Sequence, residues 1–272
     1  MTDKGAGYLG RIPRQRLISI IGGSAGNLVE WYDWFAYASF AIYFAPVFFP
    51  KADPTAQLLS TATIFAAGFV MRPLGAWVMG RFADHRGRKA GLTLSVALMF
   101  SGSLLLALAP TYAQAGLLGP AVLLLARVLQ GLSLGGEYGA SATYLSEMAP
   151  KANRGFWASF QYMTLCGGQL LAIAVAVILQ GFLSEAQLTA WGWRIPFVIG
   201  ALLALAVYLL RKNLAETPSF ENQAVDRPLS TASLLWRERR RESILVAMLS
   251  AGGGLGAYAY TSYMQKYLFN TV

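Results

Sequence analysis

Charged residues are scarce in this chain, and the scarcity points to its class. Only 13% of the 272 residues are Asp, Glu, Lys or Arg, while 56% are hydrophobic. A soluble domain carries about 25% charged residues. Alternating strand patterns are also absent, so the segments that cross the membrane should be helices. The composition therefore predicts an all-α integral membrane protein and excludes an ordinary soluble domain.

The residues that thiol and metal chemistry require are nearly missing as well. The single cysteine, Cys166, allows no internal disulfide and no cysteine metal cluster. The single histidine, His85, lies in a charged segment, where we expect it to be solvated. The glycines of 252–256 follow no strand and lie in an apolar run, which excludes a phosphate loop. We therefore expect neither an enzyme nor a cofactor.

Long apolar segments are what the chain does contain. A helix needs about 20 apolar residues to cross a bilayer. Six complete spans and a seventh that ends with the chain are predicted at 18–44, 58–80, 90–109, 117–146, 155–182, 193–210 and 243–268. The organisation expected from them is a cytoplasmic segment 1–17, a six-helix half 18–210, a cytoplasmic linker 211–242 and the first helix of a truncated second half, 243–272.

Lys and Arg are distributed unevenly between the two sides of these spans. Seventeen of the 22 lie on the side of the N-terminus and three on the other side, while Arg72 and Arg127 lie within spans. Because cytoplasmic loops are enriched in Lys and Arg, this distribution places the N-terminus in the cytoplasm. It also explains the net charge of +9: the positive residues orient the chain in the membrane and contact anionic lipid headgroups, rather than binding nucleic acid.

Five ionisable residues lie inside the spans, where a charge costs roughly 2.5–3.5 kcal/mol at the bilayer centre. They are Glu30, Asp33, Arg72, Arg127 and Glu137. Left unpaired, they would together offset the stability of a whole domain. We therefore expect them to pair with one another or to line a wet cavity.

Depth in the membrane indicates possible partners. Arg127 lies at a depth similar to that of Asp33, so it can reach Asp33 or Glu30. Arg72 either binds an anionic substrate or pairs with Glu137, and the sequence leaves both open.

Helical spacing groups other polar residues with these charges. In the first span, Asn27, Glu30 and Tyr37 share one face with Trp34. This stripe is either a polar lining or a set of structural contacts to a neighbouring helix. In the fourth span, Arg127, Gln130 and Tyr138 share one face, with Glu137 beside it. The glycines of that span recur every four residues, which favours close helix packing; they are Gly131, Gly135 and Gly139.

The segment 80–89 carries a specific motif, in which Gly80 and Asp84 precede Arg-Gly-Arg-Lys. With it the chain resembles the metabolite:proton symporters of the major facilitator superfamily. Further matching stretches are Gly26-Asn27 with Glu30-Trp31 and Asp33, 65–73, Gln130-Gly131 to Ser141, 158–162 with Gly167-Gly168-Gln169, 191–197 and 263–267. Trp34 departs from the family pattern in the first span and should alter the shape of the pocket.

This resemblance implies a twelve-helix bacterial inner-membrane symporter, of which the chain is expected to cover the N-terminal part. The implied activity is proton-coupled import of a small dicarboxylate, such as 2-oxoglutarate, by alternating access. Candidate proton-coupling residues are Glu30, Asp33 and Arg127. Candidate substrate-binding residues are Asn27, Tyr37, Arg72, Arg127, Gln130, Tyr138, Gln161 and Gln169. Candidate cytoplasmic gate residues are Gly80, Asp84, Arg88, Glu147 and Arg154.

Two alternatives to this function stay open. The first is another substrate within the same family: a tricarboxylate, a sugar acid or an osmolyte. The chain could also be a truncated fragment that inserts into the membrane without transporting anything. In each case the predicted partners are the lipid bilayer and the missing C-terminal half, and for a transporter also protons and a small carboxylate.

Overall fold

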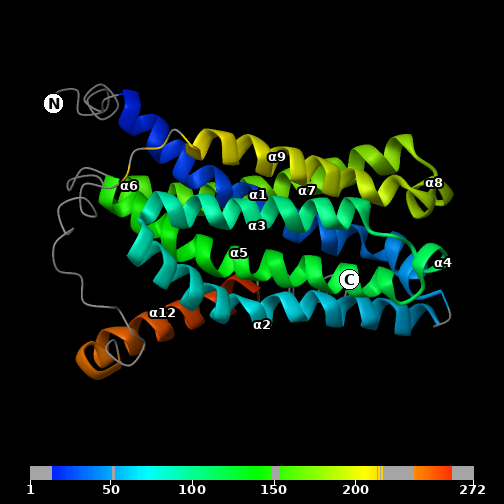
Figure 1. Ribbon diagram of the computed structural model, residues 1–272, viewed down its shortest axis with the longest axis horizontal. Helices are drawn as coiled ribbons and strands as arrows, with labels where there is room; N and C mark the ends of the chain where they lie inside the picture. Colours follow the sequence, from blue (N-terminus) through cyan, green and yellow to red (C-terminus); the bar gives the residue numbers. More distant parts are fainter. Residues whose placement is uncertain are drawn as a thin grey trace, which may run out of the picture. The chain divides into compact units, whose positions relative to one another are not determined.

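The computed structural model describes residues 14–50, 53–148, 154–212, 214, 216 and 236–258. All regular structure among these residues is helical (Figure 1), which confirms the predicted all-α architecture. The chain divides into two units, 1–227 and 228–272, and each is described by itself.

The first unit is a bundle of long helices joined by short connections. Its elements are α1 (Arg14–Phe48), α2 (Pro54–Arg86), α3 (Arg88–Leu108), α4 (Tyr112–Ala115), α5 (Leu118–Met148), α6 (Arg154–Ala158), α7 (Phe160–Phe182), α8 (Glu185–Ala190), the 3₁₀ turn η2 (Gly192–Arg194) and α9 (Ile195–Lys212). The described helix of the second unit is α12 (Arg240–Tyr258).

Within the described part of the chain, five helical segments are long and apolar enough to cross a membrane: Pro54–Arg86, Arg88–Leu108, Leu118–Glu147, Gly155–Phe182 and Gly192–Lys212. They agree with five predicted spans. The first predicted span lies within α1, which has 35 residues but is less apolar because it carries two carboxylates and several Trp and Tyr side chains. The seventh predicted span continues beyond α12 into residues outside the described part, as does most of the predicted linker, so the domain boundaries remain a prediction.

The segment 80–89, which the predicted spans leave between two helices, is itself helical except at Gly87. Helix α2 continues to Arg86 and α3 begins at Arg88, so only Gly87 interrupts the two helices. Gly87 has φ 105°, a conformation that residues with a Cβ atom rarely adopt. The motif of this segment is therefore presented on two helix ends that meet at a sharp corner.

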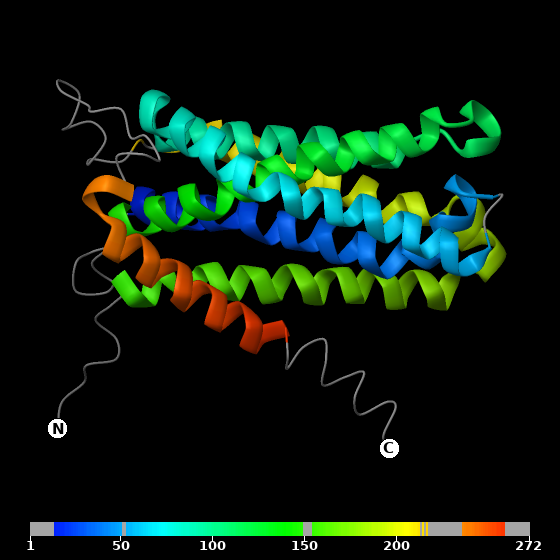
Figure 2. The same cartoon turned by 90° about the horizontal axis from the view of Figure 1, so that it is seen from below.

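Pairwise packing of the helices builds the bundle. Helix α2 lies along α5, α3 lies along both α5 and α9, and α1 lies along α7 (Figure 2). A Cβ atom at Gly75 or Gly131 would collide with backbone atoms of the facing helix, Leu132 and Gly68 respectively. Close packing is thereby confirmed for the Gly131 region, but a Cβ atom at Gly139 meets no described atom within 4 Å.

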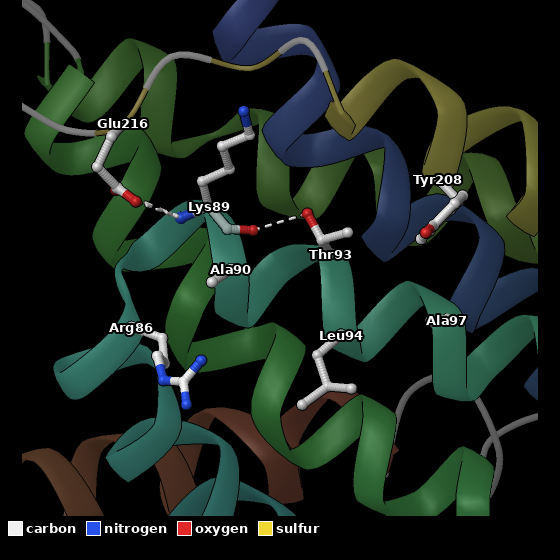
Figure 3. A pocket seen from close by; sticks show the side chains of 8 residues that line it. All are labelled: Arg86, Lys89, Ala90, Thr93, Leu94, Ala97, Tyr208 and Glu216. Atoms are coloured by element: carbon white, nitrogen blue, oxygen red, sulfur yellow. Dashed lines mark hydrogen bonds between the residues drawn. The ribbon is translucent and has the colours of Figure 1, made fainter.

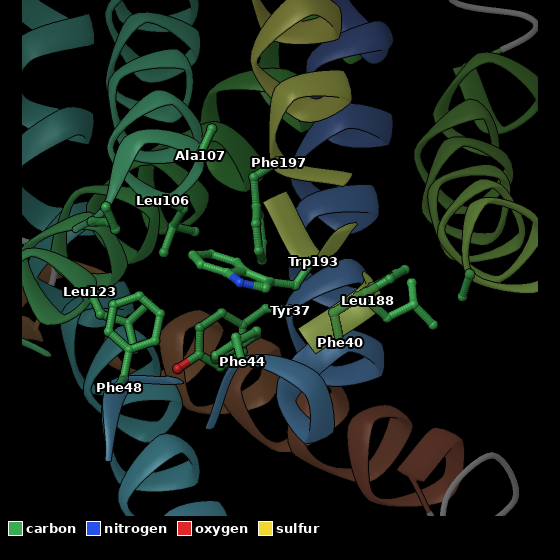
Figure 4. Packing of buried hydrophobic residues seen from close by; sticks show 13 residues of the cluster. Tyr37, Phe40, Phe44, Phe48, Leu106, Ala107, Leu123, Leu188, Trp193 and Phe197 are labelled. Carbon is green, nitrogen blue, oxygen red and sulfur yellow. The ribbon is translucent and has the colours of Figure 1, made fainter. Parts of the chain in front are cut away.

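Aromatic side chains fill the bundle near α4 and α8. Phe44 and Phe48 of α1 pack against Trp193 of η2 and Phe197 of α9 (Figure 4), and all four are fully buried. This apolar cluster begins on α1 with Tyr37, about one turn beyond Asp33, so Asp33 lies next to it.

Candidate substrate and proton site

Asp33 and Arg127 form a buried ion pair between α1 and α5. Arg127 Nη1 lies 4.0 Å from Asp33 Oδ2, and neither side chain is exposed. Gln130 joins them, because its Oε1 accepts from Arg127 Nη1 at 2.7 Å while its Nε2 donates to Asp33 Oδ2. Ser103 of α3 donates to Asp33 Oδ1 at 3.1 Å. The predicted pairing of Arg127 with Asp33 is thus confirmed, whereas Ser103 was missed because a lone serine in an apolar span carries no signal.

Two guanidinium groups lie against the same set of aromatic rings, here called the aromatic wall: Trp34, Tyr37 and Phe69. That of Arg127 lies 3.6 Å from the ring centroid of Tyr37 and 5.2 Å from that of Trp34. That of Arg72, from α2, lies 4.2 Å from Trp34 and 4.1 Å from Phe69. Nε and Nη2 of buried Arg127 have no hydrogen-bond partner among the described residues. The arrangement presents two positive charges with free donors on Arg127, which suits a ligand with more than one carboxylate.

Glu137 pairs with Arg211 rather than with Arg72, the partner considered from the sequence. Arg211 Nη1 donates to Glu137 Oε2 at 2.8 Å, and Nη2 donates to Oε1. Arg211 was assigned to the linker as a topology charge, and that assignment is wrong because its side chain is completely buried. It also donates to the carbonyl groups of Gly22 at 3.3 Å and Gly23 at 3.1 Å. An arginine in the last turn of a helix can extend outward or fold inward, and the sequence does not distinguish the two.

Glu30 lies apart from both ion pairs. It is 2% exposed, and its Oε1 lies 2.5 Å from the hydroxyl group of Ser133 on α5. The contact of Arg127 with a first-span carboxylate is therefore made to Asp33 alone.

Asn27 and Gln161 lie together, as a shared site requires, but they bind each other. Asn27 Nδ2 donates to the backbone carbonyl oxygen of Gln161 at 2.8 Å and to Thr164 Oγ1 at 2.9 Å. Ser141 donates to Gln161 Oε1 at 3.0 Å. These amides thus hold α1 and α5 to α7, so the structural alternative describes Asn27 better than the polar lining does.

Tyr138 and Gln169 do not reach the cluster in the described part of the chain. Tyr138 is 47% exposed, whereas its neighbour Glu137 is fully buried. The buried face of α5 includes Gln130, Glu137 and Ser141, and Tyr138 lies about 100° from Glu137 around the helix. The place of Tyr138 in a substrate site therefore stays a prediction, as does that of Gln169, which is half-buried.

Three of the five candidate gate residues meet near the corner between α2 and α3. Arg88 Nη1 lies 2.5 Å from Asp84 Oδ1, and Arg88 Nε lies 4.0 Å from Glu147 Oε1. The structure thus brings together Asp84, Arg88 and Glu147, three of the candidate gate residues. Arg154 begins α6, but its side chain lies outside the described part, and Gly80 has no described atom within 4 Å of an added Cβ.

Glu216 completes this corner and is not among the residues predicted from the sequence. Its carboxylate accepts hydrogen bonds from the backbone N–H groups of Arg88 at 3.1 Å and Lys89 at 3.2 Å (Figure 3). A negative group at a helix N-terminus satisfies free N–H groups and balances the helix dipole. A cavity of about 450 Å³ lies beside it, lined by Arg86, Lys89, Ala90, Thr93, Leu94, Ala97, Tyr208 and Glu216. The acidic residue just after the sixth span was the available signal.

Comparison with known proteins decides the family. The family model described as "Sugar (and other) transporter" matches residues 19–244. The chain belongs to this family of the major facilitator superfamily. It is 53% identical to the alpha-ketoglutarate permease of Escherichia coli K12 over 95% of the chain and 59% of the permease. It is 40% identical to the citrate-proton symporter of Salmonella typhi over 85% of the chain and 54% of the symporter.

Solved structures of the superfamily show the same fold. The xylose transporter XylE of E. coli, in a partially occluded inward-open conformation, matches with a TM-score of 0.71 at 21% identity, over 78% of this chain and 51% of XylE. The chain spans little more than half the length of these transporters. The relatives are permeases and symporters, which confirms the expected class of multi-pass membrane transporter rather than enzyme.

Proposed function

We propose that the protein containing this chain is a proton-coupled symporter that imports a small dicarboxylate, such as 2-oxoglutarate, by alternating access. The buried Asp33–Arg127 pair beside Arg72 is the observation that carries the proposal. Two guanidinium groups against one aromatic wall match the two carboxylates of such a substrate. The 53% identity to a permease named for alpha-ketoglutarate supports the same substrate.

Coupling follows from competition for Arg127. A substrate carboxylate that binds the guanidinium of Arg127 replaces Asp33 as its partner. Asp33 is then left without its cation in a dry environment, so the first helix, which carries both Asp33 and Glu30, binds a proton more tightly. Substrate and proton thus favour each other's binding, which is the requirement for symport.

A tricarboxylate is the second candidate substrate, since two of the relatives are citrate-proton symporters at 40% and 38% identity. Trp34 sits under both guanidinium groups and limits the room between them. Sugar acids and osmolytes are weaker candidates, because they lack a second carboxylate to bind the second guanidinium group.

Transport by alternating access needs two halves that rock against each other. We expect the second half to correspond to the C-terminal part of the relatives, which this chain does not cover. We also expect the chain to lie in the bacterial inner membrane with its N-terminus in the cytoplasm. A non-transporting fragment is the alternative for the 272-residue chain alone.

Uptake by proteoliposomes tests the proposal. Vesicles carrying the full-length protein should accumulate labelled 2-oxoglutarate, and an inward proton gradient should stimulate uptake. Absence of that stimulation would contradict the coupling. Competition by an excess of citrate, gluconate or betaine ranks the substrates, and stronger inhibition by citrate than by unlabelled 2-oxoglutarate would favour the tricarboxylate.

A further inference from the structure

Glu30 has the poorest set of partners of the three buried carboxylates. Its Oε1 contacts Ser133, while its Oε2 is buried and has no hydrogen-bond partner among the described residues. The ion pairs found within 4.0 Å in the described part do not include Glu30. A buried carboxylate with neither a cation nor enough donors strongly disfavours its ionised form.

The other two carboxylates are well supplied with donors. Asp33 accepts from Ser103 and Gln130 and lies 4.0 Å from Arg127. Glu137 accepts from both terminal nitrogens of Arg211 and from the hydroxyl of Ser95. Both environments suit a negative charge. Glu30 differs from both carboxylates because it has neither a paired cation nor a second donor among the described residues.

The hydroxyl of Ser133 provides a second, independent indication. Its Oγ lies 2.5 Å from Glu30 Oε1 and 2.8 Å from the backbone carbonyl oxygen of Ser95. A serine has one hydroxyl hydrogen, and a carbonyl oxygen can only accept. If Ser133 donates to the Ser95 carbonyl, the short contact to Glu30 needs a hydrogen from Glu30. A neutral Glu30 satisfies both contacts, whereas an ionised one leaves two acceptors competing for one hydrogen.

Charged groups on the helices around Glu30 fit this assignment. Glu137 of α5 adds a negative charge nearby, and Arg211 of α9 is already balanced by Glu137. Arg72 of α2 acts on Glu30 at a distance, since its guanidinium lies over the Trp34 and Phe69 rings. On α1 itself, Asp33 one turn away is a further negative charge.

We propose that Glu30 is a neutral carboxylic acid in this conformation and holds the proton that the symporter carries, with Ser133 as the hydroxyl that positions it. Asp33 then remains the charged partner of Arg127. The identity of this proton as the transported one rests on the proposed function, but the protonation of Glu30 does not.

Infrared spectroscopy tests the protonation directly. The full-length protein in lipid vesicles at pH 7 is compared with E30Q and D33N, because a carboxylic acid and a carboxylate absorb in separate C=O regions. The spectrum of the parent minus that of E30Q should contain a carboxylic-acid band, and that of the parent minus D33N should contain carboxylate bands only. Carboxylate bands for Glu30, or an acid band for Asp33, would overturn the assignment.

The role of Ser133 has its own readout. S133A removes a hydrogen-bond partner of the acid, so the Glu30 band should move to higher frequency while the protein remains folded. The matched control is S101A, since Ser101 is exposed on α3 and bonds only to the carbonyl of Ala97 at 2.9 Å. An unshifted band in S133A, or an equal shift in S101A, would contradict the positioning role.

Proton movement separates this inference from the proposed function. In vesicles filled with a pH dye, 2-oxoglutarate should drive proton entry through the parent, and E30Q should lose it while gel filtration shows a monodisperse protein. Proton entry through E30Q would show that Glu30 does not carry the transported proton. An infrared acid band without any proton entry in the parent would leave Glu30 protonated and reject the proposed symport instead.

Discussion

The guanidinium of Arg211 binds the carboxylate of Glu137 at a point where four helices meet. Arg211 comes from α9 and Glu137 from α5, while the remaining donors of Arg211 reach carbonyl groups of Gly22 on α1 and Leu92 on α3. Neither side chain of the pair is more than 1% exposed. Buried pairs of this kind are strongly destabilising when only one partner is removed.

The first prediction concerns the stability of this junction. R211M leaves the Glu137 carboxylate buried without a cation, so it should lower the free energy of unfolding by about 3–5 kcal/mol. The double variant R211M/E137M should recover much of that loss, because it removes both charges. Denaturant unfolding in detergent measures the change. K212M, at the exposed next residue, should stay within about 0.5 kcal/mol of the parent, and an equal loss in K212M would argue against the buried pair.

The second prediction concerns the shape of the Arg127 cation. R127K keeps the charge but loses the planar group that contacts both Gln130 and the Tyr37 ring. Uptake of 2-oxoglutarate by the full-length protein should fall at least about tenfold, which corresponds to about 1.4 kcal/mol. R194K is the matched control, since half-buried Arg194 donates to the carbonyl of Ala109 away from the site. Unchanged uptake in R127K would remove Arg127 from substrate binding.

The third prediction concerns the aromatic wall. W34L removes the ring under both Arg72 and Arg127, and each desolvated cation–π contact is worth up to about 2 kcal/mol. We expect the affinity for 2-oxoglutarate, measured by calorimetry, to fall roughly 5- to 30-fold. W77L, which alters a 54% exposed tryptophan of α2, should leave the affinity unchanged. A similar loss in both variants would indicate a general packing defect.

The fourth prediction concerns the corner between α2 and α3. G87A places a Cβ atom at a residue with φ 105°, which should cost about 1–2 kcal/mol in the free energy of unfolding. G80A, inside α2 with no described atom near an added Cβ, should be neutral or stabilise by about 0.5–1 kcal/mol. Thermal unfolding of the two variants makes the comparison, and equal melting temperatures would contradict the strained corner.

Much of the architecture was predictable from the order of residues. Segment lengths and the rarity of charge predicted the long helices, because a bilayer admits few other backbones. A first-span carboxylate was also predictable as the partner of Arg127 from its similar depth, but the sequence left Asp33 and Glu30 both open. The motif around Asp84 and Arg88 was sufficient to indicate the family.

Side-chain direction and close packing were not predictable in the same way. Glu137 and Tyr138 are adjacent in the sequence, yet only the packing of α5 against its neighbours decides that Glu137 faces inward. Small hydroxyl groups such as Ser103 and Ser133 are tolerated almost anywhere in a helix, so their contacts with Asp33 and Glu30 follow only from helix register. Glu216 becomes a helix cap only when α9 returns the chain to the start of α3.

The sequence by itself determined that this is a multi-pass helical membrane protein with carboxylates and arginines placed deep in its spans, because composition and the cost of buried charge allow little else. The tertiary structure alone decided how those charges divide: Asp33 with Arg127, Glu137 with Arg211, and Glu30 with a hydroxyl group. The physical reason is that a charge requires a partner wherever it is buried, but which partner it obtains depends on the helix faces that packing brings within a few ångströms.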